Sequence, residues 1–463
     1  MINYFLMPHP PIALPQIGKG EEKKIQNTID AFNRAFTEIE SFNPQTLIII
    51  SPHGTLFRDA FSIYAEPFIT GDFKKFNVND LFFKYEIDLD LTFKIIDKCR
   101  ENNLPIVPLT TNISEEYNIP LTLDHGSMVP LYFYKNTNNA KLIHITYSLL
   151  SKFDHIKFGN FIKEVISETN KNTVVIASGD LSHCLTLDGL YPYSPSGTLF
   201  DNTLIENLKS GDLETALNIH GKLLSEASEC GMRSLYILGG ILGTKTIQSE
   251  LYSYEGPFGV GYAVMKFSEG SGDLLGSIKE NLNTLHIKKL NNPQTPYTSL
   301  ARRALDYYFK SKKILDLDSI DTSSIPNIKK GVFVSIYTNG NLRGCVGTTS
   351  PTTSCIANEI ATNSLSAAFK DPRFSPLTYS ELLESTISIY LLNESEKTTF
   401  EKLDPKVYGV IVKANGKTGL LLPNLEGITT SLEQVHIAKA KGGIVDDDGE
   451  IALERFTVER FEE

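Results

Sequence analysis

The stretch Thr46-Leu47-Ile48-Ile49-Ile50-Ser51-Pro52-His53 decides the fold of the first part of this chain. Its four consecutive aliphatic residues, 47–50, predict a strand buried on both faces, because a half-buried strand would alternate polar and apolar positions. Pro52 ends the strand pairing and places His53 just beyond the carboxyl end of that strand. In open α/β sheets ligands bind at that edge. The stretch therefore predicts a parallel sheet and a site at its rim.

The same pattern of an apolar run followed by a histidine turn occurs twice more. Residues 4–7 precede His9 in a Pro-rich turn, and residues 174–177 precede the turn that ends at His183. Parallel strands of one sheet would bring these two histidines and His53 to the same edge. One turn histidine is typical of a solvated or capping residue. Three at one edge indicate a site.

The first 268 residues are predicted to form a three-layer α/β/α domain around a largely parallel sheet. Residues 21–42 carry apolar side chains at helical spacing, so residues 4–50 predict a strand, helix and strand with a parallel pair and a right-handed crossover. The aromatic-rich residues 61–83 are expected to be an irregular surface loop or flap over the site. Further strands are predicted at 104–109, 141–147 and near 264, and further helices at 89–100, 158–168, 204–227 and 234–242.

A domain boundary is predicted at the Gly- and Ser-rich residues 268–276. A chain of 463 residues is too long for one core, so at least two domains are expected. Residues 269–295 are interpreted as a linker with one short helix, and residues 296–463 as an α+β domain. Its predicted helices lie at 300–309, 355–369 and 431–441, its strands at 331–337, 385–392 and 451–456, a hairpin turn at 338–341, and a hairpin at 409–412 and 419–422.

Composition excludes several classes of function. The net charge of -11 and pI near 5.4 argue against nucleic-acid binding, which normally needs a basic face. The start of the chain lacks a basic segment followed by an apolar one, and no apolar run reaches the roughly 20 residues of a membrane helix. A cytoplasmic protein without a membrane partner is expected. The five scattered cysteines predict reduced thiols.

The histidines fall into three groups. His9, His53, His125 and His183 lie in turns beside apolar runs, where imidazoles are presented to ligands. His144 lies within a predicted strand and is interpreted as a hydrogen-bonded core residue. Only surface interpretations are available for the remaining four, His155, His220, His286 and His436.

Two neutral imidazoles and a carboxylate bind a divalent transition metal on one face and leave positions open for substrate. The carboxylate would be Asp180 or Glu229, although Asp180 could equally orient His183 or cap a turn. Cys230 is a softer candidate ligand, with a small buried residue as its ordinary interpretation. A Ser-His-Asp hydrolase is the competing site, but no Gly-x-Ser-x-Gly turn occurs.

Residues 1–268 resemble the class III extradiol ring-cleavage dioxygenase (LigB-type) and Memo-like superfamily. The resemblance implies that His9, His53 and Glu229 hold a non-haem Fe(II), that His183 is the catalytic acid/base, and that His125 supports the ligands or binds substrate. It rests on six short motifs in the expected order: Met7-Pro8-His9-Pro10-Pro11, Ile50-Ser51-Pro52-His53, Leu123-Asp124-His125-Gly126, Ser178-Gly179-Asp180-Leu181-Ser182-His183, Ser228-Glu229-Cys230-Gly231 and Glu255-Gly256-Pro257-Phe258-Gly259.

The resemblance leaves the third ligand and the metal open. In the Memo-like branch a cysteine takes about the position of Glu229 and Cys230, so either residue is a candidate. Zinc or another divalent metal is the alternative to Fe(II).

Residues 296–463 resemble the AMMECR family, through Leu342-Arg343-Gly344-Cys345-Val346-Gly347, Asp371-Pro372-Arg373-Phe374-Ser375-Pro376-Leu377 and Gly419-Leu420-Leu421-Leu422-Pro423. Chains that join both domains resemble AmmeMemoRadiSam system proteins, which implies a radical S-adenosylmethionine enzyme as partner. Arg343, Cys345 and Arg373 form a candidate second site for a small anion or a reactive thiol. The equal alternative is that the glycines serve tight turns and Cys345 is core.

The combined expectation is a metal-dependent, dioxygenase-like enzyme that chelates a small diol or catechol-like substrate and cleaves or rearranges a C–C bond. One alternative is a metal-dependent lyase, isomerase or hydrolase that does not use O2. Another is a non-catalytic metal-binding or redox scaffold for the radical S-adenosylmethionine partner, and a third is a purely structural interaction protein. The oligomeric state stays open.

Overall fold

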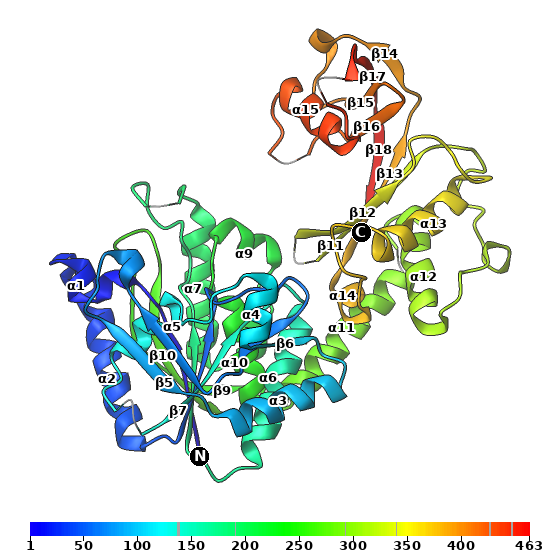
Figure 1. Cartoon of the computed structure of the whole chain (residues 1–463). Helices are drawn as coiled ribbons and strands as arrows, with labels where there is room; N and C mark the ends of the chain where they lie inside the picture. Colours follow the sequence, from blue (N-terminus) through cyan, green and yellow to red (C-terminus); the bar gives the residue numbers. More distant parts are fainter. Residues whose placement is uncertain (137–138, 190, 292, 339, 426, 446–447) are drawn as a thin grey trace. The chain divides into compact units, whose positions relative to one another are not determined.

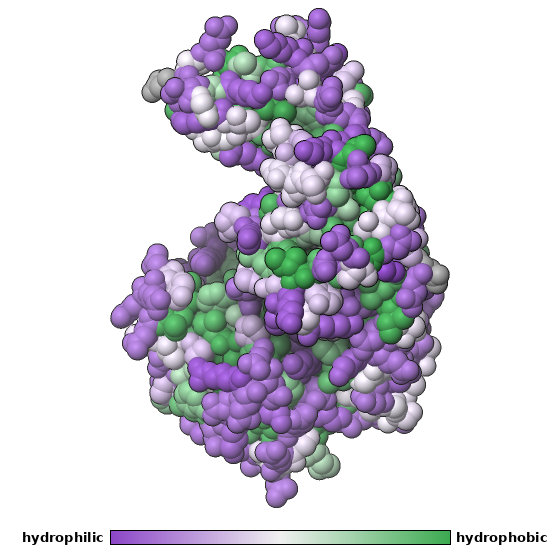
Figure 2. Space-filling model, turned by 90° about the vertical axis from the view of Figure 1, so that its right-hand side faces the viewer, coloured by the Kyte–Doolittle hydropathy of each residue, from purple (hydrophilic) through white to green (hydrophobic). Residues whose placement is uncertain are grey.

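The computed structural model describes residues 1–136, 139–189, 191–291, 293–338, 340–425, 427–445 and 448–463. The chain divides into two compact units, Met1–Asn281 and Leu282–Glu463. On the face drawn in Figure 2, hydrophilic side chains predominate and apolar side chains form patches among them. Within the described ranges, no helix is long and apolar enough to cross a membrane.

The first unit is built around one eight-stranded sheet with the order β6-β3-β7-β2-β8-β1-β10-β9 (Figure 1). The four strands β7, β2, β8 and β1 run parallel, and β10 and β9 are antiparallel at one edge. The prediction of a largely parallel sheet is confirmed, although β8 separates β1 from β2. The strands are β1 (Ile2–Met7), β2 (Thr46–Ser51), β3 (Phe61–Tyr64), β6 (Ile106–Leu109), β7 (Lys141–Thr146), β8 (Thr173–Ser178), β9 (Ile247–Glu255) and β10 (Tyr262–Glu269).

Helices cover both faces of this sheet (Figure 1). On one face, α2 (Gln26–Phe42) and α5 (His125–Tyr132) share a core with alternate residues of the central strands, including Phe5, Leu47 and Ile49. On the other, α6 (Lys152–Ser167) packs on α10 (Met232–Leu242), which contacts β8, β1 and β2. The remaining helices are α1 (Pro15–Gly18), α3 (Leu89–Glu101), α4 (Thr111–Tyr117), α7 (Pro195–Ser210), α8 (Leu213–Leu217) and α9 (Gly221–Ala227).

The expectation of an irregular surface loop at residues 61–83 is wrong. Phe61 to Tyr64 form the fully buried strand β3, and the Phe61 ring stacks on Phe158 with 4.3 Å between centroids. Strands β4 (Phe68–Asp72) and β5 (Phe82–Glu86) then form a separate two-stranded sheet. The aromatic side chains of this stretch are abundant because many of them pack inside the unit.

The residues expected to form a linker with one short helix, 269–295, contain the 18-residue helix α11 (Leu274–Asn291). Its side chains Leu274 and Ile278 are buried. The division between the two compact units falls within this helix, between Asn281 and Leu282.

The second unit has the predicted α+β composition, with two four-stranded antiparallel sheets of order β12-β11-β13-β18 and β14-β17-β15-β16. Its strands are β11 (Val332–Thr338), β12 (Asn341–Gly347), β13 (Thr386–Leu392), β14 (Glu396–Thr398), β15 (Gly409–Ala414), β16 (Lys417–Leu421), β17 (Ala452–Phe456) and β18 (Val458–Glu462). Its helices are α12 (Pro296–Ser311), α13 (Ile356–Phe369), α14 (Tyr379–Glu384) and α15 (Ser431–Lys441). The turn predicted at 338–341 includes residue 339, which lies outside the described residues.

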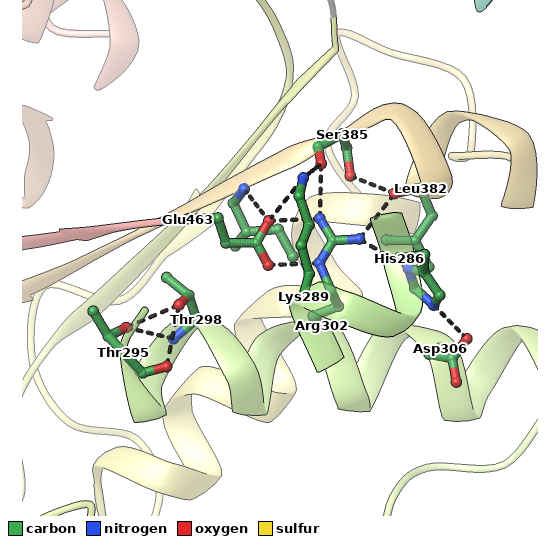
Figure 3. Close-up of polar contacts among 10 residues, drawn as sticks. His286, Lys289, Thr295, Thr298, Arg302, Asp306, Leu382, Ser385 and Glu463 are labelled. Atoms are coloured by element: carbon green, nitrogen blue, oxygen red, sulfur yellow. Dashed lines mark hydrogen bonds and ion pairs between the residues drawn. The ribbon is translucent and has the colours of Figure 1, made fainter. Parts of the chain in front are cut away.

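A buried polar network organises the start of the second unit (Figure 3). The Arg302 guanidinium is fully buried and donates to both Glu463 carboxylate oxygens at 2.5 Å. It also contacts Nδ1 of His286 at 3.1 Å, and Nε2 of His286 lies 2.8 Å from the Asp306 carboxylate. Because a guanidinium only donates, the His286 tautomer is fixed with its proton on Nε2.

The surface interpretation of His286 and His155 is therefore wrong. His286 is 2% exposed and His155 is fully buried, with Nδ1 of His155 lying 2.7 Å from the Ser151 carbonyl. Both lie on helices, His155 on α6 and His286 on α11, and their burial comes from the packing of these helices.

Candidate metal centre

His9, His53 and His125 converge in the first unit. Each offers one ring nitrogen, and the three nitrogens lie within 4.8 Å of one another. The two Nε2 atoms of His9 and His53 are 3.0 Å apart, and the His53 and His125 rings stack with 4.2 Å between centroids. His9 is buried, His125 is half-buried and His53 is exposed. The group therefore has one side open to solvent.

The sheet explains why His9 and His53 meet. β1 and β2 both run parallel to β8, which lies between them. The carboxyl ends of the three strands share one edge, as the repeated pattern of an apolar run and a histidine turn predicts. His125 reaches the same edge from another direction, because it is the first residue of α5.

Ser178, at the end of β8, fixes the orientation of the His9 ring. Its hydroxyl donates to the Gly126 carbonyl at 2.5 Å and lies 2.9 Å from Nδ1 of His9. A carbonyl only accepts, so the single hydroxyl proton is used there and Nδ1 of His9 must be the donor to Ser178. The lone pair of His9 is therefore on Nε2, which faces the other histidines.

Asp124 supports the other two histidines together. One carboxylate oxygen accepts from the Ser51 hydroxyl at 2.5 Å and caps α5 through the Ser127 N–H at 3.1 Å. The other lies 3.0 Å from Nε2 of His144, which confirms His144 as a hydrogen-bonded core residue. The Ser51 hydroxyl in turn accepts a hydrogen bond from the backbone N–H of His53 at 3.3 Å. Burial alone would raise the pKa of Asp124, but the hydrogen bonds from His144 and Ser51 hold it below its ordinary value.

The imidazoles of the group are held neutral. Burial lowers the pKa of His9 well below its ordinary value, and the neighbouring histidines His53 and His125 lower it further. Burial and the proximity of His53 lower the pKa of His125 to about 4. Neutral imidazole is the form that binds a metal.

Of the other candidate ligands, Cys230 and Asp180 lie next to His9. The Cys230 sulfur is 3.7 Å and one Asp180 carboxylate oxygen 3.8 Å from Nε2 of His9. The other Asp180 oxygen accepts a hydrogen bond from the backbone N–H of His9 at 2.8 Å. Burial raises the pKa of Asp180 to about 7.

Glu229 is not among the described residues whose ligand atoms converge. Its carboxylate accepts from the Met232 N–H at 2.7 Å, at the first residue of α10. Anionic side chains are favoured at helix N-termini. The structure thus brings His125 to His9 and His53, whereas the resemblance implied Glu229 for the third position.

His183 lies beyond β8 and close enough to His53 for their charges to interact. Its backbone N–H donates to the Ala227 carbonyl at 3.0 Å, and the centroid of its ring lies 5.1 Å from that of Tyr191. Its Nε2 is buried and has no hydrogen-bond partner among the residues that the structure describes. Burial, then the proximity of His53, lower its pKa to about 4. A neutral ring with an unused nitrogen is available to exchange a proton with a bound molecule.

Ser51, Asp124 and Ser178 were not identified from the sequence as parts of the site. The sequence does place them close to the site. Asp124 directly precedes His125, Ser51 lies two residues before His53, and Ser178 follows the predicted strand at 174–177. Their roles depend on contacts between separate segments, which the linear sequence does not reveal.

Two residues of the candidate second site, Arg343 and Arg373, lie beside Phe374 in the second unit. The guanidinium carbons of Arg343 and Arg373 lie 5.9 and 5.4 Å from its ring centroid. Arg373 contacts the Cys345 carbonyl at 3.4 Å. Arg343 donates to Glu381 at 2.6 Å, so its charge is already matched by a carboxylate.

Comparisons with known proteins match two family models. Residues 3–265 match the catalytic LigB subunit of aromatic ring-opening dioxygenase, and residues 298–461 match AMMECR1. These are the two families that the sequence motifs resemble.

Related proteins cover the whole chain or its second part. Protein CA_C1420 of Clostridium acetobutylicum is 42% identical over 465 residues, covering 100% of this chain and 99% of that protein. A protein of Thermotoga maritima is 40% identical over 168 residues, covering 36% of this chain and 97% of its own length. The crystal structure of the uncharacterized protein PH0010 from Pyrococcus horikoshii has 27% identity and a TM-score of 0.34, covering 36% of this chain and 89% of that one.

Proposed function

Because the chain belongs to the family of the catalytic LigB subunit of aromatic ring-opening dioxygenase and carries an AMMECR1 domain after it, we propose that its first unit is a metal-dependent enzyme. The proposed substrate is a small diol or catechol-like molecule, and the proposed reaction is cleavage or rearrangement of a C–C bond. The observation that carries the proposal is the convergence of His9, His53 and His125 beside the unpartnered nitrogen of His183.

The donor set fits a divalent transition metal. Three neutral imidazoles suit iron, zinc, copper or nickel. Metal–nitrogen bonds of about 2 Å place ligand nitrogens roughly 3–4 Å apart, so a group within 4.8 Å needs only small adjustments. The close Nε2 contact between His9 and His53 also requires a shared proton or a shared cation. We propose Fe(II) from the family and zinc as the alternative.

We assign the proton transfer to His183. A bound divalent metal polarises a substrate hydroxyl and lowers its pKa. The hydroxyl proton would pass to Nε2 of His183, whose ring is neutral and whose nitrogen is otherwise unused. The partly exposed Tyr191 ring beside His183 offers an aromatic surface for a planar substrate. His183 thus serves as the acid/base, while His9 stays oriented by Ser178.

Metal analysis on protein purified without oxygen tests the ligand set. About one metal ion per chain is expected in wild type and in His183→Ala, with loss of metal in His53→Ala. Iron would support the dioxygenase-like reaction, and zinc would favour hydrolytic or lyase chemistry. If wild type takes up no metal even when metals are added back, the enzyme proposal fails.

Turnover measurements separate catalysis from metal binding. A catechol and diol screen with and without O2 should show product for wild type and none for His183→Ala at equal metal content. Product without O2 would replace the dioxygenase by a lyase or isomerase. Bound metal without turnover of any diol would favour the scaffold that works with a radical S-adenosylmethionine enzyme.

A further inference from the structure

A cavity of about 260 Å³ lies in the second unit, beside the buried Arg302 network. Lys289 and Glu463 line it together with Lys288 and Gln294, and Leu285 and Pro293 supply apolar surface. The function proposed above involves none of these residues. The cavity therefore needs its own explanation.

The Lys289 amine is the reactive group in this cavity. The side chain is 18% exposed, and its Nζ donates to the Ser385 carbonyl at 2.7 Å (Figure 3). Its burial and the nearby Arg302 charge lower its pKa to about 8. An ordinary lysine amine with a pKa near 10.4 is almost fully protonated at neutral pH, whereas this one is neutral in a useful fraction of molecules. A neutral amine in a cavity is a nucleophile towards carbonyl carbon.

The surroundings of Lys289 select the kind of ligand. Glu463 lies 3.7 Å from the amine, is 6% exposed and is held by two hydrogen bonds from Arg302. This carboxylate is therefore placed to relay protons to and from the amine. When the Lys289 amine is neutral, the cavity and its wall still carry two cations, Lys288 and Arg302, against the single Glu463 carboxylate. The excess positive charge favours a ligand that is itself an anion.

We propose that Lys289 is the imine-forming residue of a binding site for small oxo acids, molecules with an aldehyde or ketone carbonyl and a carboxylate. Nζ attacks the carbonyl carbon and forms a C–N bond. The carbonyl oxygen takes up both amine protons, with Glu463 as relay, and leaves as water. One water is released for each imine, and the step needs no oxidant or reductant. Lys288 and the Gln294 amide are placed to hold the carboxylate at the rim.

Reductive trapping tests the site in the full chain. Glyoxylate with cyanoborohydride converts an imine into a stable carboxymethyl-lysine, which peptide mass spectrometry assigns to one residue. At pH 7.5 a lysine with a pKa of about 8 has roughly 200 times the neutral fraction of an ordinary lysine, and restricted access reduces this gain. We expect Lys289 to be labelled at least about ten times faster than its exposed neighbour Lys288.

Propionaldehyde, which lacks the carboxylate, is the matched probe. Its preference for Lys289 over Lys288 should be several times smaller than that of glyoxylate. Lys288→Met should slow the labelling of Lys289 by glyoxylate without abolishing it, and should leave the labelling of Lys289 by propionaldehyde unchanged. Equal preference for the two probes would overturn the oxo acid assignment. Labelling of Lys289 no faster than Lys288 would overturn the site itself. Thermal unfolding of Lys288→Met, expected to match wild type, checks that the variant is folded.

Discussion

Replacing Ser178 by alanine should weaken metal binding without touching a ligand. In wild type the Ser178 hydroxyl accepts from Nδ1 of His9 at 2.9 Å and so keeps the lone pair on Nε2. Without it, the proton is better placed on Nε2, where it can be donated to Nε2 of His53 at 3.0 Å. That proton has to leave before a metal can bind. The loss of such a supporting hydrogen bond typically lowers metal affinity about 10–100-fold, or about 1.4–2.7 kcal/mol.

Ser182→Ala is the matched control. Ser182 is also buried, and its hydroxyl donates to the Ala227 carbonyl and accepts from the Cys184 N–H, both at 3.0 Å. It therefore loses the same number of hydrogen bonds but has none to His9. Any affinity change in Ser182→Ala measures the general cost of removing a buried hydroxyl from this loop.

The assay is a titration of the apo protein with Co2+ against a competing chelator, followed by the absorption of the bound ion. Urea unfolding of the apo variants reports their folding separately. If Ser178→Ala binds Co2+ within twofold of wild type, or if Ser182→Ala loses as much affinity, the assignment of the His9 tautomer is refuted.

Three further predictions concern stability. Arg302→Met should lower the free energy of unfolding in urea by about 3–5 kcal/mol, because it strands the buried Glu463 carboxylate; a loss below about 1 kcal/mol would contradict this. Gly240→Ala should lower the melting temperature, because the added Cβ would meet the Ile156 carbonyl at 2.0 Å; an unchanged melting temperature would show that α6 and α10 can separate freely. Burial raises the pKa of Asp201 to about 6, so the folded state keeps a proton that the unfolded state releases, and this contribution lowers stability by about 2–3 kcal/mol as pH rises from about 4 to 6. Asp201→Asn should lack that decline in urea titrations across the same pH range, and an identical pH dependence in both proteins would refute the assignment.

The central strands could be predicted from the sequence because their burial leaves a local mark. Uninterrupted aliphatic runs in β1, β2 and β8 identify strands covered on both faces, and the following turns carry His9 and His53. The edge strand β9 was missed, since its sequence Ile-Gln-Ser-Glu-Leu-Tyr-Ser-Tyr-Glu mixes polar and apolar residues. Edge strands lack the strong apolar signal of a buried strand.

The composition of the site was harder to predict than its position. Motif order pointed to Glu229, but the orientation of that side chain depends on where α10 begins. His125 joins His9 and His53 because Asp124 caps α5 and bonds to Ser51, a contact across 73 residues of sequence. Such long-range contacts leave no periodic pattern, so a single sequence does not reveal them.

The position of β1 between β8 and β10 has a consequence for the synthesis of the protein. The first strand to leave the ribosome pairs with residues 173–178 on one side and with residues 265–267 on the other, so it stays unpaired until more than half of the first unit has been made. At about 5–20 residues per second, that wait lasts roughly 10–35 s. During this time an apolar strand carrying His9 is exposed to chaperones and to other nascent chains. Because β8 lies between β1 and β2 and aligns their carboxyl ends, the histidine cluster is expected to assemble, and metal to be loaded, only after residues 173–178 have been translated.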